Sequence, residues 1–275
     1  MRTLKISLVL LSAMTFSGCA TISTNKQAPK LLSTAQVTPL TESGKTLRQL
    51  PEPAGKILVS MYKFRDKTGQ FKSSPSNAYS TVVTQGAGSI LLKALLESGW
   101  FTPLEREGLN DLITERKIRE KELGKKSIPN LYSAPLMLEG GIIAYDTNMR
   151  TGGIGASYLG IGASSQYRED QVTVNLRLVN VNTGEILHSV NATKSVYSQK
   201  VGSSVFNFVR FKELLEFEAG YSFNEPAQFC VIDAIESALI QLIVKGLEDH
   251  HWELKNPKDI NHPIFKKYLG TPVAS

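Results

Sequence analysis

The chain has 275 residues, which fits one large domain or two small ones, and it carries a formal net charge of +6. Apolar residues make up 41% and charged residues 20% of the sequence, a composition that excludes an intrinsically disordered protein. The positive excess is mild and comes without a dense basic run or a basic-aromatic cluster, so the sequence gives no reason to expect a nucleic-acid partner.

The N-terminus is typical of a bacterial lipoprotein signal. Arg2 and Lys5 precede an apolar run, residues 6–16, that is too short to span a bilayer as a helix. The small residues after this run lead directly into Cys19, which resembles a lipobox. That resemblance implies removal of residues 1–18, attachment of diacylglycerol and an N-acyl chain to Cys19, and sorting to the outer membrane, because Ala20 follows and not Asp. The alternative is an ordinary secretory signal with a chance cysteine.

Residues 19–55 are rich in Thr, Ser, Pro, Gln and Lys, and they predict an extended tether between the lipid and the folded domain. The second cysteine, Cys230, lies in an apolar stretch. With Cys19 lipidated it has no intrachain partner, so we expect a buried and unreactive thiol.

Ordered structure is expected from Lys56 onward, where short β-type runs alternate with helical repeats. The pattern predicts strands over 57–62, 101–104 and 135–139, a loop over 64–78, and helices over 82–98, 109–122 and 226–249. Pro226 suits the first turn of the last helix. The order of elements predicts an α+β fold in which an α/β layer domain, residues 56–139 and 212–275, packs helices on a sheet.

Between residues 140 and 211 the helical period gives way to alternation of apolar and polar residues. The alternation is clearest over 143–150 and 172–178, and it continues over 186–201 and 205–211, which predicts two long β-hairpins inserted into the α/β chain. Their apolar faces have two possible partners, a larger soluble sheet or lipid, and periodicity fits both.

Lipid as the partner would require assembly of several chains. Four strands from one chain are too few to close a barrel, for which the smallest examples have about eight. An open sheet edge in hydrocarbon leaves backbone groups unpaired at several kcal/mol each. The hairpins would then form part of an oligomeric transmembrane β-barrel around one axis.

Motifs for catalysis or nucleotide binding are absent from the sequence. The five glycines between 152 and 162 do not follow GxGxxG spacing, and no HExxH, GxSxG, P-loop or CxxC occurs. His250 and His251, near a helix end, fit a cationic C-terminal cap better than a metal site. Asp146, Glu169 and Asp170 lie on alternating strands and fit a polar pore lining or a rim better than catalysis. We therefore expect no enzyme activity, no catalytic residues, no metal and no cofactor other than the lipid on Cys19.

At this point the sequence resembles the CsgG family, the curli production assembly/transport components that form the curli secretion channel. The matching runs span most of the mature chain in the same order. They are Gly55-Lys56-Ile57, Thr68-Gly69-Gln70-Phe71-Lys72, Trp100-Phe101-Thr102-Pro103-Leu104-Glu105-Arg106, Gly160-Ile161-Gly162-Ala163, Val174-Asn175-Leu176-Arg177, Thr183-Gly184-Glu185-Ile186-Leu187, Gly220-Tyr221 and Asn224-Glu225-Pro226.

The resemblance implies a nonameric ring in the bacterial outer membrane, with the α/β domain in the periplasm and two hairpins per subunit, residues 140–211, in a shared barrel. It implies export of the unfolded curli subunits CsgA and CsgB without a nucleotide, assisted by the accessory factors CsgE and CsgF. The other partners would be further copies of this chain and outer-membrane lipid.

The resemblance also implies that a loop after the first strand narrows the channel. In this sequence the loop corresponds to Phe71, Lys72, Ser74, Asn77, Ala78 and Tyr79. The family has Tyr, Asn and Phe at its constriction, and these positions carry Ser74, Ala78 and Tyr79 here, with Asn77 one residue early. One aromatic ring is thus retained, at Tyr79.

Two other classes of function compete with the channel. One is a periplasmic-facing lipoprotein that acts as a binding or scaffold module, with hairpins that complete a soluble sheet. The other is a lipid-anchored hydrolase, for which the sequence offers almost no motif.

Overall fold

A computed structural model of the chain describes residues 38, 40–72, 80–124, 128–151, 166–201, 205–209 and 226–269. The chain divides into two units, Met1–Thr38 and Pro39–Ser275, and every helix and strand below belongs to the second. The predictions for Cys19, Ser74, Asn77, Ala78, Tyr79 and the glycine-rich bend at 152–162 lie outside the described residues.

A single seven-stranded sheet forms the base of the fold. Its strands are β1 (Ile57–Ser60), β2 (Phe64–Asp66), β3 (Phe101–Leu104), β4 (Leu136–Thr151), β5 (Gln166–Asn180), β6 (Ile186–Val201) and β7 (Val205–Val209). They follow the order β3-β1-β4-β5-β6-β7, and β2 pairs with β4 beyond the end of β1. The pairs among β1 to β4 are parallel and the pairs from β4 to β7 are antiparallel, so an α/β half and a meander share one sheet.

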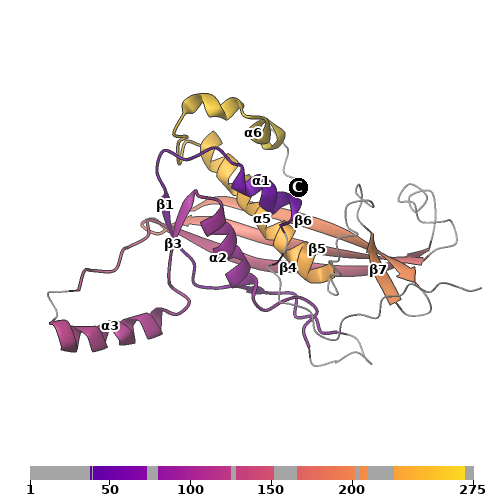
Figure 1. The fold of residues 1–275 in the computed structure, drawn as a ribbon, viewed down its shortest axis with the longest axis horizontal. Coiled ribbons are helices and arrows are strands. Elements are labelled where there is room, and N and C mark those ends of the chain that lie inside the picture. Colours follow the sequence, from indigo (N-terminus) through magenta and orange to yellow (C-terminus); the bar gives the residue numbers. More distant parts are fainter. Residues whose placement is uncertain are drawn as a thin grey trace, which may run out of the picture. The chain divides into compact units, whose positions relative to one another are not determined.

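The chain also forms five described helices. They are α1 (Glu42–Arg48), α2 (Ala87–Glu97), α3 (Leu109–Leu123), α5 (Pro226–Glu248) and α6 (Pro263–Tyr268), with a 3₁₀ turn at Pro257–Asn261. The long helix α5 lies across β5 and β6, and both α1 and α2 pack against it (Figure 1). In contrast, no residue of α3 is buried.

The apolar face of β5 packs against α5 and not against lipid. Val172, Val174, Leu176 and Leu178 are at most 1% exposed, they belong to one core cluster with the buried residues of α5, and β5 contacts α5. Full burial of such a side chain contributes about 1.5–3 kcal/mol. Alternation left two possible partners for this apolar face, other protein side chains or lipid. For residues 172–178 the structure shows protein side chains as the partner.

The phase of the alternation in β4 differs from the prediction. Ile143 and Tyr145 were expected on one face, but Ile143 is 43% exposed while Ile142 and Tyr145 are buried. The pairing of β4 with β5 shifts between Ile142 and Ala144, which marks a β-bulge. A bulge inserts one extra residue into a strand, so it moves every later side chain to the other face.

The extended tether predicted up to residue 55 is wrong from Thr41 onward. Helix α1 occupies Glu42–Arg48, and the side chain of Leu47 in this helix is buried in the core. Thr41 caps this helix, because its hydroxyl accepts a hydrogen bond from the Gly44 N–H at 2.8 Å.

Other boundaries differ by a few residues. The expected loop 64–78 begins with a short strand, β2, and the helix expected from Val82 begins at Ala87. The predicted strand 101–104 and the predicted start of the last helix at Pro226 agree with the structure. None of the described helices combines the length and apolar character needed to cross a membrane.

Candidate functional site

The base of the predicted constriction loop is a short pair of antiparallel segments. Phe71 forms a β-bridge with Thr81, the Lys72 N–H donates to the Ser80 carbonyl at 2.8 Å, and the Val82 N–H donates to the Gln70 carbonyl at 3.0 Å. The Phe71 side chain is 60% exposed. The described residues on either side of 73–79 are therefore held next to each other by main-chain hydrogen bonds.

Asp66 ties this loop to the sheet. Its carboxylate accepts hydrogen bonds from the Thr68 N–H at 2.8 Å and the Thr68 hydroxyl at 2.7 Å. On the other side of the loop, Gln85 Nε2 donates to the same carboxylate at 3.1 Å. Asp66 is the last residue of β2, so both ends of the loop are fixed to a strand that pairs with β4.

The hydrophobic core ends at the level of Tyr145, Asp170 and Val196. Asp170 is 1% exposed and accepts hydrogen bonds from the Tyr145 hydroxyl at 2.7 Å, from the Thr147 hydroxyl at 2.8 Å and from Arg168 Nε at 2.9 Å. Its carbonyl lies 3.7 Å from Cys230 Sγ, which belongs to the first turns of α5. The expectation that Asp170 lines a pore is wrong, because this carboxylate is buried beside α5.

The strands continue beyond this level. Figure 1 shows β4, β5 and β6 running past the end of α5 to the place where β7 joins the sheet. Among the described residues, the edge of β4 opposite β5 has no partner strand after Ile142, and the outer edge of β7 has none. Beyond the core, the described part of the sheet is thus four strands wide, and no further described strand pairs with either of its outer edges.

A ladder of polar side chains covers the sheet face that points away from α5. Gln171 bonds to Ser195 at 3.1 Å, Thr173 to Thr193 at 3.0 Å, and Asn175 Nδ2 to Asn191 at 2.8 Å. These cross-strand pairs leave the face hydrated and fix the register of β5 with β6. The polar side of the predicted alternation is therefore confirmed for this part of the chain.

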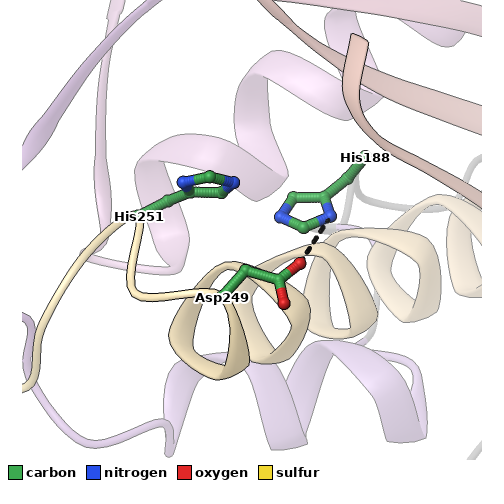
Figure 2. A group of neighbouring side chains, drawn as sticks. All are labelled: His188, Asp249 and His251. Carbon is green, nitrogen blue, oxygen red and sulfur yellow. Dashed lines mark ion pairs between the residues drawn. The ribbon is translucent and has the colours of Figure 1, made fainter.

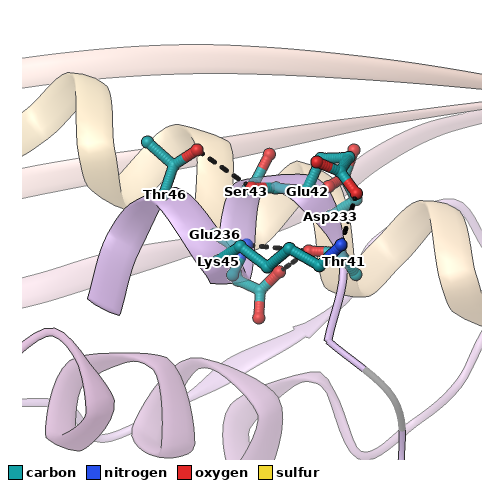
Figure 3. A network of polar contacts seen from close by, with 8 residues as sticks. Thr41, Glu42, Ser43, Lys45, Thr46, Asp233 and Glu236 are labelled. Carbon is teal, nitrogen blue, oxygen red and sulfur yellow. Dashed lines mark hydrogen bonds and ion pairs between the residues drawn. The ribbon is translucent and has the colours of Figure 1, made fainter. Parts of the chain in front are cut away.

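A polar network joins α1, α5 and β6. Two carboxylates one turn apart on α5, Asp233 and Glu236, lie under the N-terminus of α1 (Figure 3). Asp233 accepts the Ser43 N–H at 3.1 Å and pairs with Lys194 of β6 at 2.6 Å, whereas Glu236 accepts the Thr41 hydroxyl. The N-terminus of a helix stabilises a negative charge nearby. Two neighbouring buried carboxylates repel each other when both are ionised, so ionisation of both groups at once is disfavoured.

The two carboxylates differ in their pKa values. Burial opposes the charge on Asp233, but Lys194 and Ser43 outweigh it and hold the pKa of Asp233 below its usual value. Glu236 forms no ion pair with a cation among the described residues, and burial raises its pKa to about 7. The network therefore holds one ionised and one largely protonated carboxyl group below neutral pH. Nothing in the local sequence signals it, because α1 and α5 are about 190 residues apart.

Cys230 is confirmed as a buried free thiol. It is 0% exposed, and burial raises its pKa to about 12. A thiol that stays protonated is a poor nucleophile, so this position offers no chemistry.

The C-terminus of α5 is capped by backbone groups. His250 adopts a left-handed conformation with φ 55°, the His250 N–H donates to the Leu247 carbonyl at 3.3 Å, and the His251 N–H donates to the Gly246 carbonyl at 2.8 Å. This is a Schellman motif. The C-terminal cap is thus formed by main-chain N–H groups, and a cationic role of the His250 and His251 side chains stays a prediction.

Comparison with known proteins agrees with the resemblance in the sequence. The family model described as "Curli production assembly/transport component CsgG" matches residues 40–271. The protein of that name from Salmonella typhimurium (strain LT2) is 45% identical over 278 residues, which cover 98% of this chain and 99% of the relative. The one from Escherichia coli K12 is 45% identical over 268 residues, covering 94% and 95%.

Solved structures give a weaker likeness. A neuraminyllactose-binding hemagglutinin homologue from Helicobacter pylori aligns with 84% of this chain and 96% of its own, at 11% identity and a TM-score of 0.34, which is too low to support an inference. The sequence comparisons decide the matter: the chain belongs to the CsgG family of curli production assembly/transport components.

Proposed function

We propose that the protein is a subunit of a ring-shaped outer-membrane channel that exports unfolded curli subunits, anchored by lipid on Cys19. The observation that carries the proposal is the four-stranded extension of the sheet beyond Asp170, whose two outer edges have no partner among the described residues. Family membership supplies the substrate class, because the relatives are named as components of curli production and transport.

The free edges support assembly from several copies. An open edge offers a row of unpaired backbone groups, and in a bilayer each of them costs several kcal/mol. Pairing β7 of one copy with the β4 edge of the next would remove both edges at once and repeat around a ring. The exposed helix α3, with Ile113 and Ile118 at 37% and 47% exposure, supports contact between copies outside the bilayer.

The body of the fold supports a division of the strands into two parts. The residues that pack on α5, up to Tyr145 and from Asp170 to Val196, belong to the periplasmic domain in this proposal. The parts beyond them would enter the membrane. In this proposal the membrane hairpins are therefore shorter than the range 140–211 that alternation suggested, because the residues that pack on α5 lie outside the membrane.

The gate of this channel would be the loop whose ends are tied by Asp66. Rings of Tyr79 side chains would exclude folded domains by size and offer only weak, exchangeable hydrogen bonds to a passing chain. The periplasmic capping factor CsgE, the outer-surface factor CsgF and a nonameric ring remain parts of the proposal that rest on the family resemblance.

Conductance in planar bilayers tests the proposal. The purified wild-type protein should give discrete channels, and Tyr79→Ala should increase their conductance, because a narrower ring is removed. Lys67→Ala, a change outside the loop, is the control and should conduct like the wild type. Absence of channels in the wild type would refute the export function, and unchanged conductance in Tyr79→Ala would remove Tyr79 from the constriction.

One observation favours the second candidate, a periplasmic binding or scaffold module. The apolar face of β5 is covered by α5 of the same chain, as in a soluble sheet. A variant with Cys19 replaced by Ala separates the two candidates, because a scaffold would be a water-soluble monomer whereas the channel would form rings that need detergent.

A further inference from the structure

The C-terminal end of α5 brings three metal-binding side chains together. The Schellman motif that ends the helix turns the chain back, so that His251 meets His188 at the start of β6. Their ring centroids lie 5.0 Å apart. Asp249, one residue before the left-handed His250, places its carboxylate oxygen 3.6 Å from His188 Nδ1.

His188 is the fixed member of this cluster. It is 7% exposed, and its Nε2 atom is buried without a hydrogen-bond partner, one of two such side-chain atoms among the described residues. Figure 2 shows the three side chains turned toward one another, with a dashed line that joins one nitrogen of the His188 ring to Asp249. A buried ring nitrogen with no partner is costly unless some other group binds it.

The geometry of the cluster suits a small divalent ion. One ligand atom from each of the three residues lies within 4.8 Å of the others. In a tetrahedral site with metal–ligand bonds of about 2.0–2.1 Å, neighbouring ligand atoms are about 3.3 Å apart. Asp249 and His251 are exposed, so their side chains can close the remaining gap around the buried His188 by rotation.

The surroundings favour a cation as well. The cluster lies at the C-terminal end of α5, where the helix dipole attracts positive charge, and the nearby Asp249 and Glu248 add to this field against one Lys245.

The geometry points to a divalent transition-metal site, of the kind that Zn²⁺ occupies, in which His188, Asp249 and His251 each supply one ligand atom and water completes the coordination. Two imidazoles and one carboxylate form a donor set typical of zinc and neighbouring ions. Bound metal would join the end of α5 to the start of β6, two elements that contact each other but come from distant parts of the sequence. This inference goes beyond the proposed channel and does not depend on it.

Metal titration of the untagged, chelator-treated full-length protein in detergent tests the site. We expect isothermal titration calorimetry to show saturable binding of one Zn²⁺ per chain, and Co²⁺ to give a visible d–d absorption band. Asp249→Asn and His251→Ala should each weaken Zn²⁺ binding by at least about tenfold and abolish the Co²⁺ band. Both residues are exposed, so these variants should fold.

The neighbouring histidine provides the matched control. His250 is exposed and lies outside the cluster, so His250→Ala should bind Zn²⁺ within about twofold of the wild type. Three results would each overturn the inference. These are no saturable Zn²⁺ binding by the wild type, wild-type affinity in both Asp249→Asn and His251→Ala, and a loss in His250→Ala as large as that in His251→Ala.

Discussion

Glu236 makes the stability of the protein depend on pH near neutrality. The group has a raised pKa of about 7 in the folded protein against 4.5 for an ordinary glutamate, mainly because it is buried. Between these two values the folded chain binds a proton that the unfolded chain releases. The stability from this group is therefore complete below pH 4.5 and is lost as the pH rises through about 7.

The size of the effect follows from the two pKa values. At about 1.4 kcal/mol per pH unit, the difference between 4.5 and about 7 corresponds to about 3 kcal/mol of unfolding free energy. For a domain of this size such a loss lowers Tm by on the order of 5–10 °C. Asp233 does not add to the change in this window, because its pKa is below its usual value of 3.8 and it stays ionised throughout.

The substitution Glu236→Gln removes the titrating carboxyl group and keeps the size and shape of the side chain. A glutamine oxygen can still accept the Thr41 hydroxyl, and the amide carries no charge at any pH. We expect Tm of the variant to be nearly constant between pH 4.5 and 8, and higher than that of the wild type at pH 8. Thermal unfolding followed by circular dichroism on the detergent-solubilised protein measures both.

Glu115→Gln on the exposed helix α3 is the control, and it should follow the wild-type curve. If the wild type and Glu236→Gln showed the same pH dependence between 4.5 and 8, Glu236 would be ionised in the folded protein, and the account of the two carboxylates under α1 would be wrong.

Three further substitutions test the packing and the ion pair. In Gly246→Ala the new Cβ would lie 1.9 Å from Trp252 Cζ2, so denaturant unfolding should show a loss of about 2 kcal/mol or more, with a changed near-ultraviolet spectrum of the indole. In Gly140→Ala the Cβ would lie 2.0 Å from the Asn175 carbonyl, so limited proteolysis should find the β4–β5 pairing lost. Lys194→Met leaves Asp233 buried without its cation, and unfolding at pH 7 should show a loss of about 3 kcal/mol, most of which is recovered in the double variant with Asp233→Asn.

Local sequence patterns predicted the elements in which the periodicity of apolar residues and the boundary residues agree. The strand Phe101–Leu104 and the strand Ile186–Val201 begin and end where the sequence places them, and α5 begins at Pro226. Short elements were missed. Helix α1 has seven residues in a polar stretch with a single buried leucine, and β2 has three residues inside a run of turn formers. Such elements depend on tertiary contacts, which a short window of sequence does not contain.

The periodicity of the sequence could not predict which partner covers the apolar face of a strand. Alternation over 172–178 correctly identified two faces of a strand, but a strand against a helix and a strand against lipid show the same period. The bulge after Ile142 was also invisible, because both Ile142 and Ile143 are apolar and either could have been the inward residue.

The polar clusters were hidden for a similar reason. Asp170 was expected on a wet surface and is buried, and His188 was not singled out at all. Each becomes important only through residues far away in the chain, Tyr145 and Cys230 for one, Asp249 and His251 for the other. Because these partners are far apart along the sequence, local composition does not reveal the contacts between them.

The attachment of α1 to α5 determines where mechanical load enters the fold. Thr41 and Ser43 bond to side chains in the middle of a long buried helix, and the chain that precedes them leads toward the N-terminus. Tension on that N-terminal segment would therefore reach α5 through Thr41 and Ser43 before it reached any strand. A pull at the N-terminus would thus be carried first by the helical layer and not by the pairing of β4 to β7.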